Sequence, residues 1–386
     1  MDEKTAPALT TFTFGPPEAE AGGVLTIDLG AIKANWQMLR RRVTPAECAA
    51  VVKGDAYGCG LEPVTALLYY AGCTTFFVAD LAEAKRVRVL APEASIYVLD
   101  GLPPNTSSVF AENNLRPVIN SLAELAEWDA FVAGSEWRGG LALQVDTGMN
   151  RLGLTIGEAA ALAPRLQSEH HGIKLLMSHF IASELTEHPL NDAQMRSFRE
   201  IRIMFRGIPS SIANSAGIFL GPSALCDMVR LGVALYGANP NPGQLNPMRP
   251  VIDLQARIVQ VREVPSGATV GYDATWKAPR ASRIAVVAVG YADGFSRAAS
   301  ATNDKRGGEA LIAGRRCPFV GRVSMDLLAI DVTDLPAGSA RRGDRVTLIG
   351  GDLDVDAVAA RLGTISYEVL TNLGRRYARI YRSAAE

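Results

Sequence analysis

The chain has 386 residues, which is long for a single hydrophobic core and predicts two domains. Its 39 basic and 40 acidic residues are mixed along the sequence and give a net charge of −1, so no basic stretch predicts binding to nucleic acid or to an anionic membrane. No apolar stretch reaches the roughly 18 residues that span a bilayer, and the acidic start does not resemble a signal peptide. We therefore expect a cytoplasmic protein with a small-molecule partner.

The five cysteines are scattered and form no Cys-x-x-Cys pair. An odd number leaves at least one free thiol, which fits a reducing compartment. The spacing predicts no zinc site, and we expect no metal in the functional site.

The first 22 residues close with Pro16-Pro17 and Gly22-Gly23, and we expect this N-terminal extension, 1–22, to be loosely held. An apolar run at 24–28 follows, and a helix is predicted over 30–42.

Residues 23–243 are predicted to form an α/β domain, because from about residue 48 apolar runs alternate with amphipathic stretches. Eight strands are expected, and eight βα units favour a closed (β/α)8 barrel of the TIM type over an open sheet. The expected strands are 48–52, 75–79, 96–99, 115–119, 141–146, 173–178, 210–213 and 226–230.

A linker rich in proline and glycine at 239–243 ends this pattern. Residues 244–386 contain short runs rich in Val and Ile between turn residues, which predicts a mostly antiparallel β domain. Its expected strands are 251–264, 283–290, 310–313, 326–332 and 345–349, followed by short helices near 354–362 and 366–374.

Lys53 stands where the first barrel strand meets a glycine-rich loop. A lysine amine that is partly desolvated at such a place loses its proton more readily and can form a Schiff base. A surface lysine that opens a loop is the alternative interpretation of this position.

The residues that follow the other strands form a coherent set, because functional groups of such barrels lie at the strand carboxyl ends. A phosphate usually lies against the loops after the last two strands, which here hold Ser215, Gly232 and Val233. Other polar residues at these ends are Tyr57, Asp146, Arg151, His179 and Arg230.

The run Val-Val-Lys-Gly-Asp-Ala-Tyr-Gly-Cys-Gly, which contains Lys53, resembles the pyridoxal-phosphate attachment motif of alanine racemases, Val-Val-Lys-Ala-Asn-Ala-Tyr-Gly-His-Gly. The resemblance extends from about residue 24 to the end of the chain. It implies that the strand at 24–28, one too many for the barrel, joins the β domain.

The resemblance also implies a role for each matching residue. Lys53 would carry pyridoxal 5′-phosphate, Arg230 would face the pyridine nitrogen, and His179 would orient Arg230. Arg151 would lie near the phenolic oxygen of the cofactor and the substrate carboxylate. The phosphate would be held by Tyr57, Ser215, Gly232, Val233 and Tyr367.

Two further residues match positions that the family supplies from the partner subunit. Tyr272, in Val-Gly-Tyr-Asp, would be the second catalytic base, and Met325, in Val-Ser-Met-Asp, would help receive the substrate carboxylate. The resemblance thus implies a homodimer with shared active sites.

Three positions depart from the family pattern. Gln144 stands where a carbamylated lysine is frequent, so we expect an anion or Asn150 to steady Arg151. Ser324 replaces a cysteine, and Asp273 replaces a glycine beside Tyr272.

We predict an alanine racemase that uses Lys53 and Tyr272 as two bases and supplies D-alanine for peptidoglycan. Taken singly, His179 could be a core histidine and Tyr272 a packed aromatic residue. The alternatives are a cofactor-binding barrel without catalysis, a decarboxylase of the same fold, and a broad-specificity or serine-preferring racemase. One hydroxyl changes binding by only about 1–3 kcal/mol, so the last is the hardest to separate.

Overall fold

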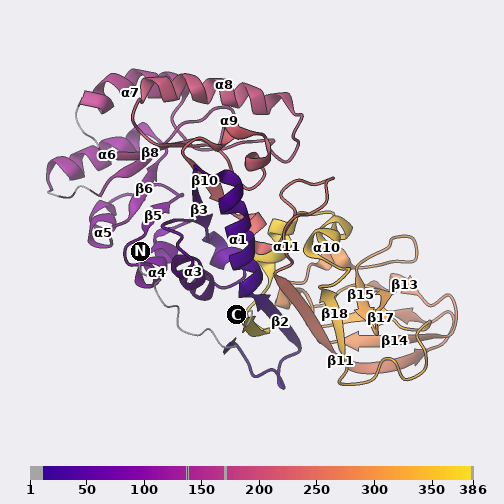
Figure 1. Ribbon diagram of the computed structural model, residues 1–386. Coiled ribbons are helices and arrows are strands. Elements are labelled where there is room, and N and C mark those ends of the chain that lie inside the picture. The colour runs from indigo at the N-terminus through magenta and orange to yellow at the C-terminus, as the bar shows by residue number, and fades with distance from the viewer. Residues whose placement is uncertain (1–11, 136, 138, 169–171, 384–386) are drawn as a thin grey trace. The chain divides into compact units, whose positions relative to one another are not determined.

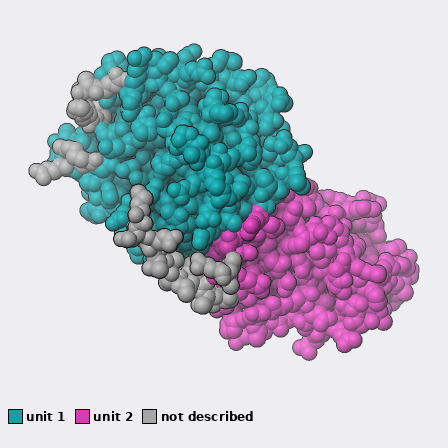
Figure 2. Space-filling view, viewed as in Figure 1, with its two compact units in different colours: residues 1–6, 33–235, 239–248 teal, residues 7–32, 236–238, 249–386 magenta. Residues whose placement is uncertain are grey.

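The computed structural model describes residues 12–135, 137, 139–168 and 172–383 (Figure 1). The described chain divides into two units (Figure 2). Unit 1 contains 33–235 and 239–248, and unit 2 contains 12–32, 236–238 and 249–383. The chain enters unit 2 for the last time after Met248, five residues beyond the domain boundary expected at 243. No helix among the described residues is long and apolar enough to cross a membrane.

Unit 1 is built on eight parallel strands in the order β10-β3-β4-β5-β6-β7-β8-β9. The barrel is nearly closed, because the N–H groups of Asp227 and Arg230 donate to the carbonyls of Ser210 and Ala213, each at 3.0 Å. The predicted barrel is therefore confirmed. The strands are β3 (Glu47–Val51), β4 (Thr75–Val78), β5 (Ser95–Val98), β6 (Arg116–Ile119), β7 (Leu141–Gln144), β8 (Ile173–Met177), β9 (Ser210–Ser211) and β10 (Met228–Leu231).

Helices surround these strands (Figure 1). Their amphipathic sequences bury one face on the barrel, and polar side chains fix where they begin. Asp80 accepts from the N–H of Glu83 at 2.9 Å, and Ser121 accepts from the N–H of Glu124 at 3.2 Å. The helices are α1 (Leu29–Val43), α3 (Leu61–Tyr70), α4 (Leu81–Leu90), α5 (Ser107–Glu112), α6 (Leu122–Ala133), α7 (Ile156–Ser168), α8 (Pro189–Met204) and α9 (Pro222–Leu225).

Unit 2 is organised around β11, which pairs antiparallel with β2, β14 and β18. The pairing of β2 with β19 is parallel, and the sheet is otherwise antiparallel, as predicted. The strands are β1 (Phe12–Phe14), β2 (Gly23–Asp28), β11 (Ile252–Val264), β14 (Ser282–Val287), β15 (Glu309–Ile312), β16 (Arg315–Pro318), β17 (Leu328–Asp331), β18 (Arg345–Ile349) and β19 (Ala378–Arg382), with a separate pair β12 (Thr269–Val270) and β13 (Trp276–Lys277). Two short helices, α10 (Val355–Leu362) and α11 (Ser366–Asn372), precede β19.

The expectation of a loose extension over 1–22 is wrong for its described part. Residues 12–14 form β1, which pairs antiparallel with β19, and Ala21 is buried. The ring of Phe14 also packs edge-on against Tyr381. The partner strand β19 lies more than 360 residues further along the chain and was not predicted. Neighbouring residues therefore gave no indication of this pairing. Residues 1–11 lie outside the described residues.

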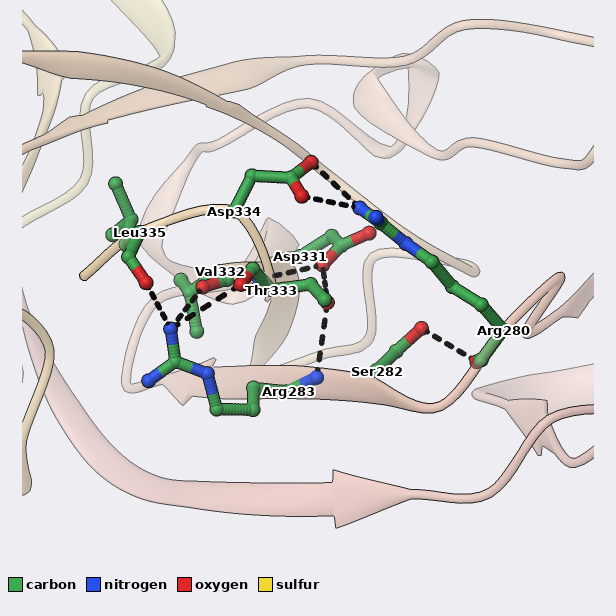
Figure 3. A network of polar contacts seen from close by, with 8 residues as sticks. All are labelled: Arg280, Ser282, Arg283, Asp331, Val332, Thr333, Asp334 and Leu335. Atoms are coloured by element: carbon green, nitrogen blue, oxygen red, sulfur yellow. Dashed lines mark hydrogen bonds and ion pairs between the residues drawn. The ribbon is translucent and has the colours of Figure 1, made fainter. Parts of the chain in front are cut away.

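An arginine network ties β14 to the loop after β17 (Figure 3). Arg283 donates through Nη2 to the carbonyls of Val332 at 3.0 Å, Thr333 at 3.3 Å and Leu335. Arg280 donates to both carboxylate oxygens of Asp334 at 2.6 Å. The guanidinium of Arg283 thus binds three carbonyls of this loop, and Arg280 adds an ion pair with Asp334 on the same loop.

Candidate active site

Lys53 opens a short turn, α2 (Lys53–Tyr57), at the carboxyl end of β3. From Gly54 to Gly58 five consecutive residues have positive φ, between 53° and 75°, so this turn is left-handed. Such a conformation costs roughly 1–2 kcal/mol for each residue with a Cβ. Backbone bonds from Ala56 to Val52 and from Gly58 to Gly54, each 2.8 Å long, close the turn. Local backbone strain of this kind is frequent at functional sites.

The amine of Lys53 has a lowered pKa. The surrounding protein atoms desolvate the amine, which is the largest effect, and the positive charge of Arg151 adds to it. Asp100 and Glu83 act in the opposite direction. The side chain of Lys53 stays accessible to solvent. Because its pKa is lowered, a larger fraction of this amine is neutral than in an ordinary lysine, and the neutral amine is the form that attacks a carbonyl carbon.

Arg230, on β10, is a buried cation with a relative exposure of 4%. It donates to Ser211 Oγ at 2.6 Å and to the carbonyl of Ser178 at 2.5 Å. Burial lowers its pKa to about 10, so it stays protonated at neutral pH. Within the described chain no carboxylate pairs with Arg230, and its Nε–H has no acceptor. This N–H is therefore available to a ligand.

His179, which follows β8, is neutral at neutral pH. Its pKa is lowered to about 3 by burial first and then by the charges of Arg230, Arg151 and Lys53. Its Nδ1 lies 3.3 Å from Arg230 Nη2. Because arginine can only donate, we assign Nδ1 as the acceptor and place the ring proton on Nε2.

The ends of β3, β9 and β10 meet at a group of small residues and hydrogen-bond donors. Ser215 Oγ accepts from the N–H groups of Gly232 at 3.0 Å and Ala234 at 3.3 Å. A Cβ at position 232 would lie 2.3 Å from the hydroxyl of Tyr57, so this hydroxyl rests against the glycine. Among the described residues the N–H groups of Ser215 and Val233 have no hydrogen-bond partner. Two free N–H groups beside small residues can hold an anion.

The loop that carries Arg151 is held by two residues that the sequence did not single out as supports. Asp146 accepts from the N–H groups of Gly148, Met149 and Asn150 at 2.8–2.9 Å. Gln144 donates through Nε2 to the carbonyl of Leu152 at 3.1 Å.

The suggestion that Asn150 steadies Arg151 is wrong. The Asn150 amide donates instead to the carbonyl of Gly148, at 3.3 Å. The amide of Gln144 therefore supports the backbone next to Arg151, rather than its side chain.

Three of the predicted site residues belong to unit 2. Tyr272 begins a short 3-10 helix (Tyr272–Ala274) and is 69% exposed, and Met325 is 54% exposed. Tyr367 lies on α11 and is half-buried. The structure thus brings together Lys53, Tyr57, Arg151, His179, Ser215, Arg230, Gly232 and Val233 within unit 1, and the assignment of the three unit 2 residues stays a prediction.

The departures near Tyr272 and Met325 have local explanations. Asp273 forms an ion pair with Arg322 at 3.0 Å. Ser324 closes a tight turn, because its N–H and its hydroxyl both donate to the carbonyl of Leu327, at 2.9 and 2.7 Å.

A (β/α)8 barrel with a desolvated lysine and an anion cradle at its strand ends, followed by an antiparallel β domain, defines a class of two-domain barrel enzymes. Comparison with known proteins names the family. Residues 27–240 match the alanine racemase N-terminal domain and residues 251–381 the alanine racemase C-terminal domain. The chain belongs to the alanine racemase family, whose members are isomerases.

Individual relatives agree with this assignment. The chain is 52% identical over 360 residues to an alanine racemase of Methylobacterium sp. (strain 4-46), covering 93% of this chain and 98% of the relative. It is 46% identical over 373 residues to an alanine racemase of Rhodospirillum rubrum, covering 96% and 98%. The crystal structure of alanine racemase from Bartonella henselae with covalently bound pyridoxal phosphate superposes with a TM-score of 0.89 at 37% identity, covering 94% of this chain and all of that one.

Proposed function

We propose that this protein is a pyridoxal-phosphate-dependent alanine racemase that interconverts L-alanine and D-alanine. The observation that carries the proposal is the placement of Lys53 on its left-handed turn, in the same barrel mouth as Arg230 and the Ser215–Val233 anion cradle. Relatives named alanine racemase at up to 52% identity support it.

The donor groups fit pyridoxal phosphate. The free N–H groups of Ser215 and Val233, with the hydroxyl of Tyr57 beside Gly232, suit a phosphate. The unused Nε–H of Arg230 suits a ring nitrogen that accepts a hydrogen bond. Lys53 supplies the amine for covalent attachment.

The cofactor, when bound, withdraws electrons from the substrate and makes its Cα proton easier to remove. Lys53 Nζ then moves a proton at Cα on one face of the substrate, and Tyr272 of the partner subunit moves a proton on the other face. Exchange between two faces inverts the configuration. Arg151, near Lys53, and Met325 of the partner subunit would hold the substrate carboxylate.

Arg230 keeps its proton at neutral pH, since its pKa is about 10. It can therefore donate a hydrogen bond to a ring nitrogen without protonating it. His179, neutral and bonded to Arg230, would fix the guanidinium in that orientation.

A homodimer is the second part of the proposal. On unit 2 the side chains of Tyr272, Tyr291, Met325 and Leu327 are 40–69% exposed. The N–H of Tyr291 donates to the carbonyl of Ser324, so Tyr291 and Met325 lie on neighbouring segments. Large apolar side chains that are exposed together are typical of interaction surfaces, which supports the proposal that a second copy of the chain binds here.

We further propose a cytoplasmic enzyme that supplies D-alanine for peptidoglycan. A racemase with broader specificity, or one that prefers serine, remains a second candidate because Asp273 adds a carboxylate beside Tyr272 and pairs with Arg322.

The test is a chiral assay of the purified protein with alanine, serine and other amino acids, read beside its visible spectrum. We expect a visible absorption band that borohydride abolishes, with the mass of the reduced cofactor found on Lys53, and alanine racemised fastest. Absence of the band would refute the cofactor assignment, whereas faster turnover of serine would refute only the choice of substrate.

A further inference from the structure

Glu83, on the first turn of α4, bridges two neighbouring βα units. One carboxylate oxygen accepts from the N–H of Ala79 at 2.9 Å, which holds the end of its own strand β4. The other oxygen accepts from the N–H of Asp55 at 3.1 Å, in the left-handed turn after β3. A single half-buried carboxylate thus joins the beginning of α4 to the segment that carries Lys53.

The left-handed turn needs such an anchor. Its internal bonds close the turn but do not fix its direction relative to the barrel. A second contact lies on the far side, where Asp55 accepts from the N–H of Leu61 at 3.0 Å and pairs with Arg86 at 3.3 Å. Arg86 lies three residues after Glu83 on α4, so the contacts of Asp55 with Glu83 and with Arg86 both lead to one helix, whereas its contact with Leu61 leads to α3.

Glu83 also acts on Lys53 through its charge. Its carboxylate, with that of Asp100, opposes the desolvation that lowers the pKa of the amine. The carboxylate is therefore close enough to stabilise the charged form of the lysine.

The same arrangement is found among the described residues at a barrel segment that does not carry Lys53. Glu124, on the first turn of α6, accepts from the N–H of Asn120 at 2.7 Å and from the backbone of Leu102 in the loop after β5. Glu124 thus performs the same structural task between two other βα units. The protein itself contains a matched control for Glu83.

We infer that Glu83 is a positioning residue for Lys53, because its carboxylate bridge orients the left-handed turn and so holds the amine where the cofactor is attached. The inference rests on the proposed function and deepens it. Glu83 acts through the turn and does not itself touch the reacting atoms.

The experiment compares the holoenzyme with the variants E83Q, E83D, E124Q and E124D. Glutamine keeps the length of the side chain but offers one acceptor oxygen, and aspartate keeps the charge but is one methylene too short to reach both N–H groups. Three quantities are measured: the rate at which pyridoxal phosphate is released, kcat and KM for L-alanine, and the unfolding temperature.

For both Glu83 variants we expect release of pyridoxal phosphate to become about tenfold faster and kcat to fall about tenfold, with KM changed less than about twofold, because a small misplacement of the attaching group is costly. Both Glu124 variants lower the unfolding temperature by a similar amount but leave release and kcat within about twofold of the wild type. E83D carries the test if E83Q does not fold.

Equal cofactor release and kcat in the Glu83 and Glu124 variants would overturn the inference. Normal cofactor release and kcat in E83D, together with impaired values in E83Q, would also overturn the inference. The negative charge of residue 83 would then be sufficient for function without the two-ended hydrogen-bond bridge. A wild-type protein without the visible band or racemase activity would instead refute the proposed function, so the two failures are distinguishable.

Discussion

Arg230 Nη2 lies 3.3 Å from His179 Nδ1, and this contact fixes the protonation of the histidine. The guanidinium can only donate, so the ring must accept through Nδ1 and stay neutral. Burial, and then the charges of Arg230, Arg151 and Lys53, lower the pKa of His179 to about 3, which also keeps the ring neutral. The pair presents a permanent donor and a neutral ring at the ends of β8 and β10.

The first prediction concerns stability in acid. Because the pKa of His179 is about 3 in the folded protein and near 6.5 when unfolded, the unfolded state binds the extra proton between these pH values. The free energy of unfolding therefore decreases as the pH falls from 6.5 towards 3, by up to about 1.4 kcal/mol per pH unit from this group. Above pH 6.5 this effect is absent.

Denaturant unfolding of the wild type and of H179Q at several pH values measures it. Glutamine can still accept from Arg230 but does not titrate, so the difference in stability between the two proteins should change only in this window. A constant difference from pH 7 to pH 4 would contradict the assignment of a buried neutral imidazole.

The second prediction concerns Gly232. In G232A the new Cβ would lie 2.3 Å from the hydroxyl of Tyr57, so the ring must move. We expect destabilisation by about 1–3 kcal/mol, as for other overpacked sites, and weaker retention of pyridoxal phosphate. Thermal unfolding and cofactor release measure the two effects.

The double variant G232A/Y57F provides the control. Removing the hydroxyl leaves the ring carbon that carried it 3.0 Å from the new Cβ, so stability should be recovered in part. Full retention of the cofactor in G232A alone would show that the hydroxyl need not rest against this glycine.

The third prediction concerns Gln144, which supports the Arg151 loop through the carbonyl of Leu152. In Q144M this bond is lost at nearly unchanged volume, which costs about 1 kcal/mol. If Arg151 binds the substrate carboxylate, KM for alanine should rise about fivefold, with kcat changed less. Steady-state kinetics in both directions measure this change.

Asn150→Gly is the matched control, since it removes a bond within the same loop at a residue with a φ of 55°. We expect its KM to stay within about twofold of the wild type, because glycine adopts that conformation without strain. A larger effect of N150G than of Q144M would return the supporting role to Asn150.

The fourth prediction tests shared active sites. K53A and Y272F should each be nearly inactive as homodimers, because every site lacks one base. After subunit exchange at equal amounts, half of the dimers contain one intact site of two, so about a quarter of the wild-type activity should return. Chiral assay of the mixture before and after exchange measures the gain.

A mixture that stays inactive although exchange is demonstrated, for example with two distinguishable tags, would refute the proposal that Tyr272 comes from the partner subunit. Recovery requires that Lys53 of one chain and Tyr272 of another complete the same site.

Local sequence determined much of the architecture. All eight barrel strands overlap the segments predicted as strands. Most of these segments are apolar, since buried parallel strands need apolar side chains on both faces, although β9 is a pair of buried serines. The position of Lys53 at a strand end followed from the same pattern, as did the antiparallel character of unit 2. These features depend on neighbouring residues, which a sequence displays directly.

The tertiary structure decided what long-range contacts control. The left-handed turn after Lys53 is bonded to Glu83 of the next βα unit, and Arg230, 51 residues away, adds to the burial that keeps His179 neutral. The pairing of β1 with β19 joins two described segments that are more than 360 residues apart. Hydrogen bonds and electrostatic interactions between distant segments form only when folding brings the segments together, so no local pattern of residues predicts them.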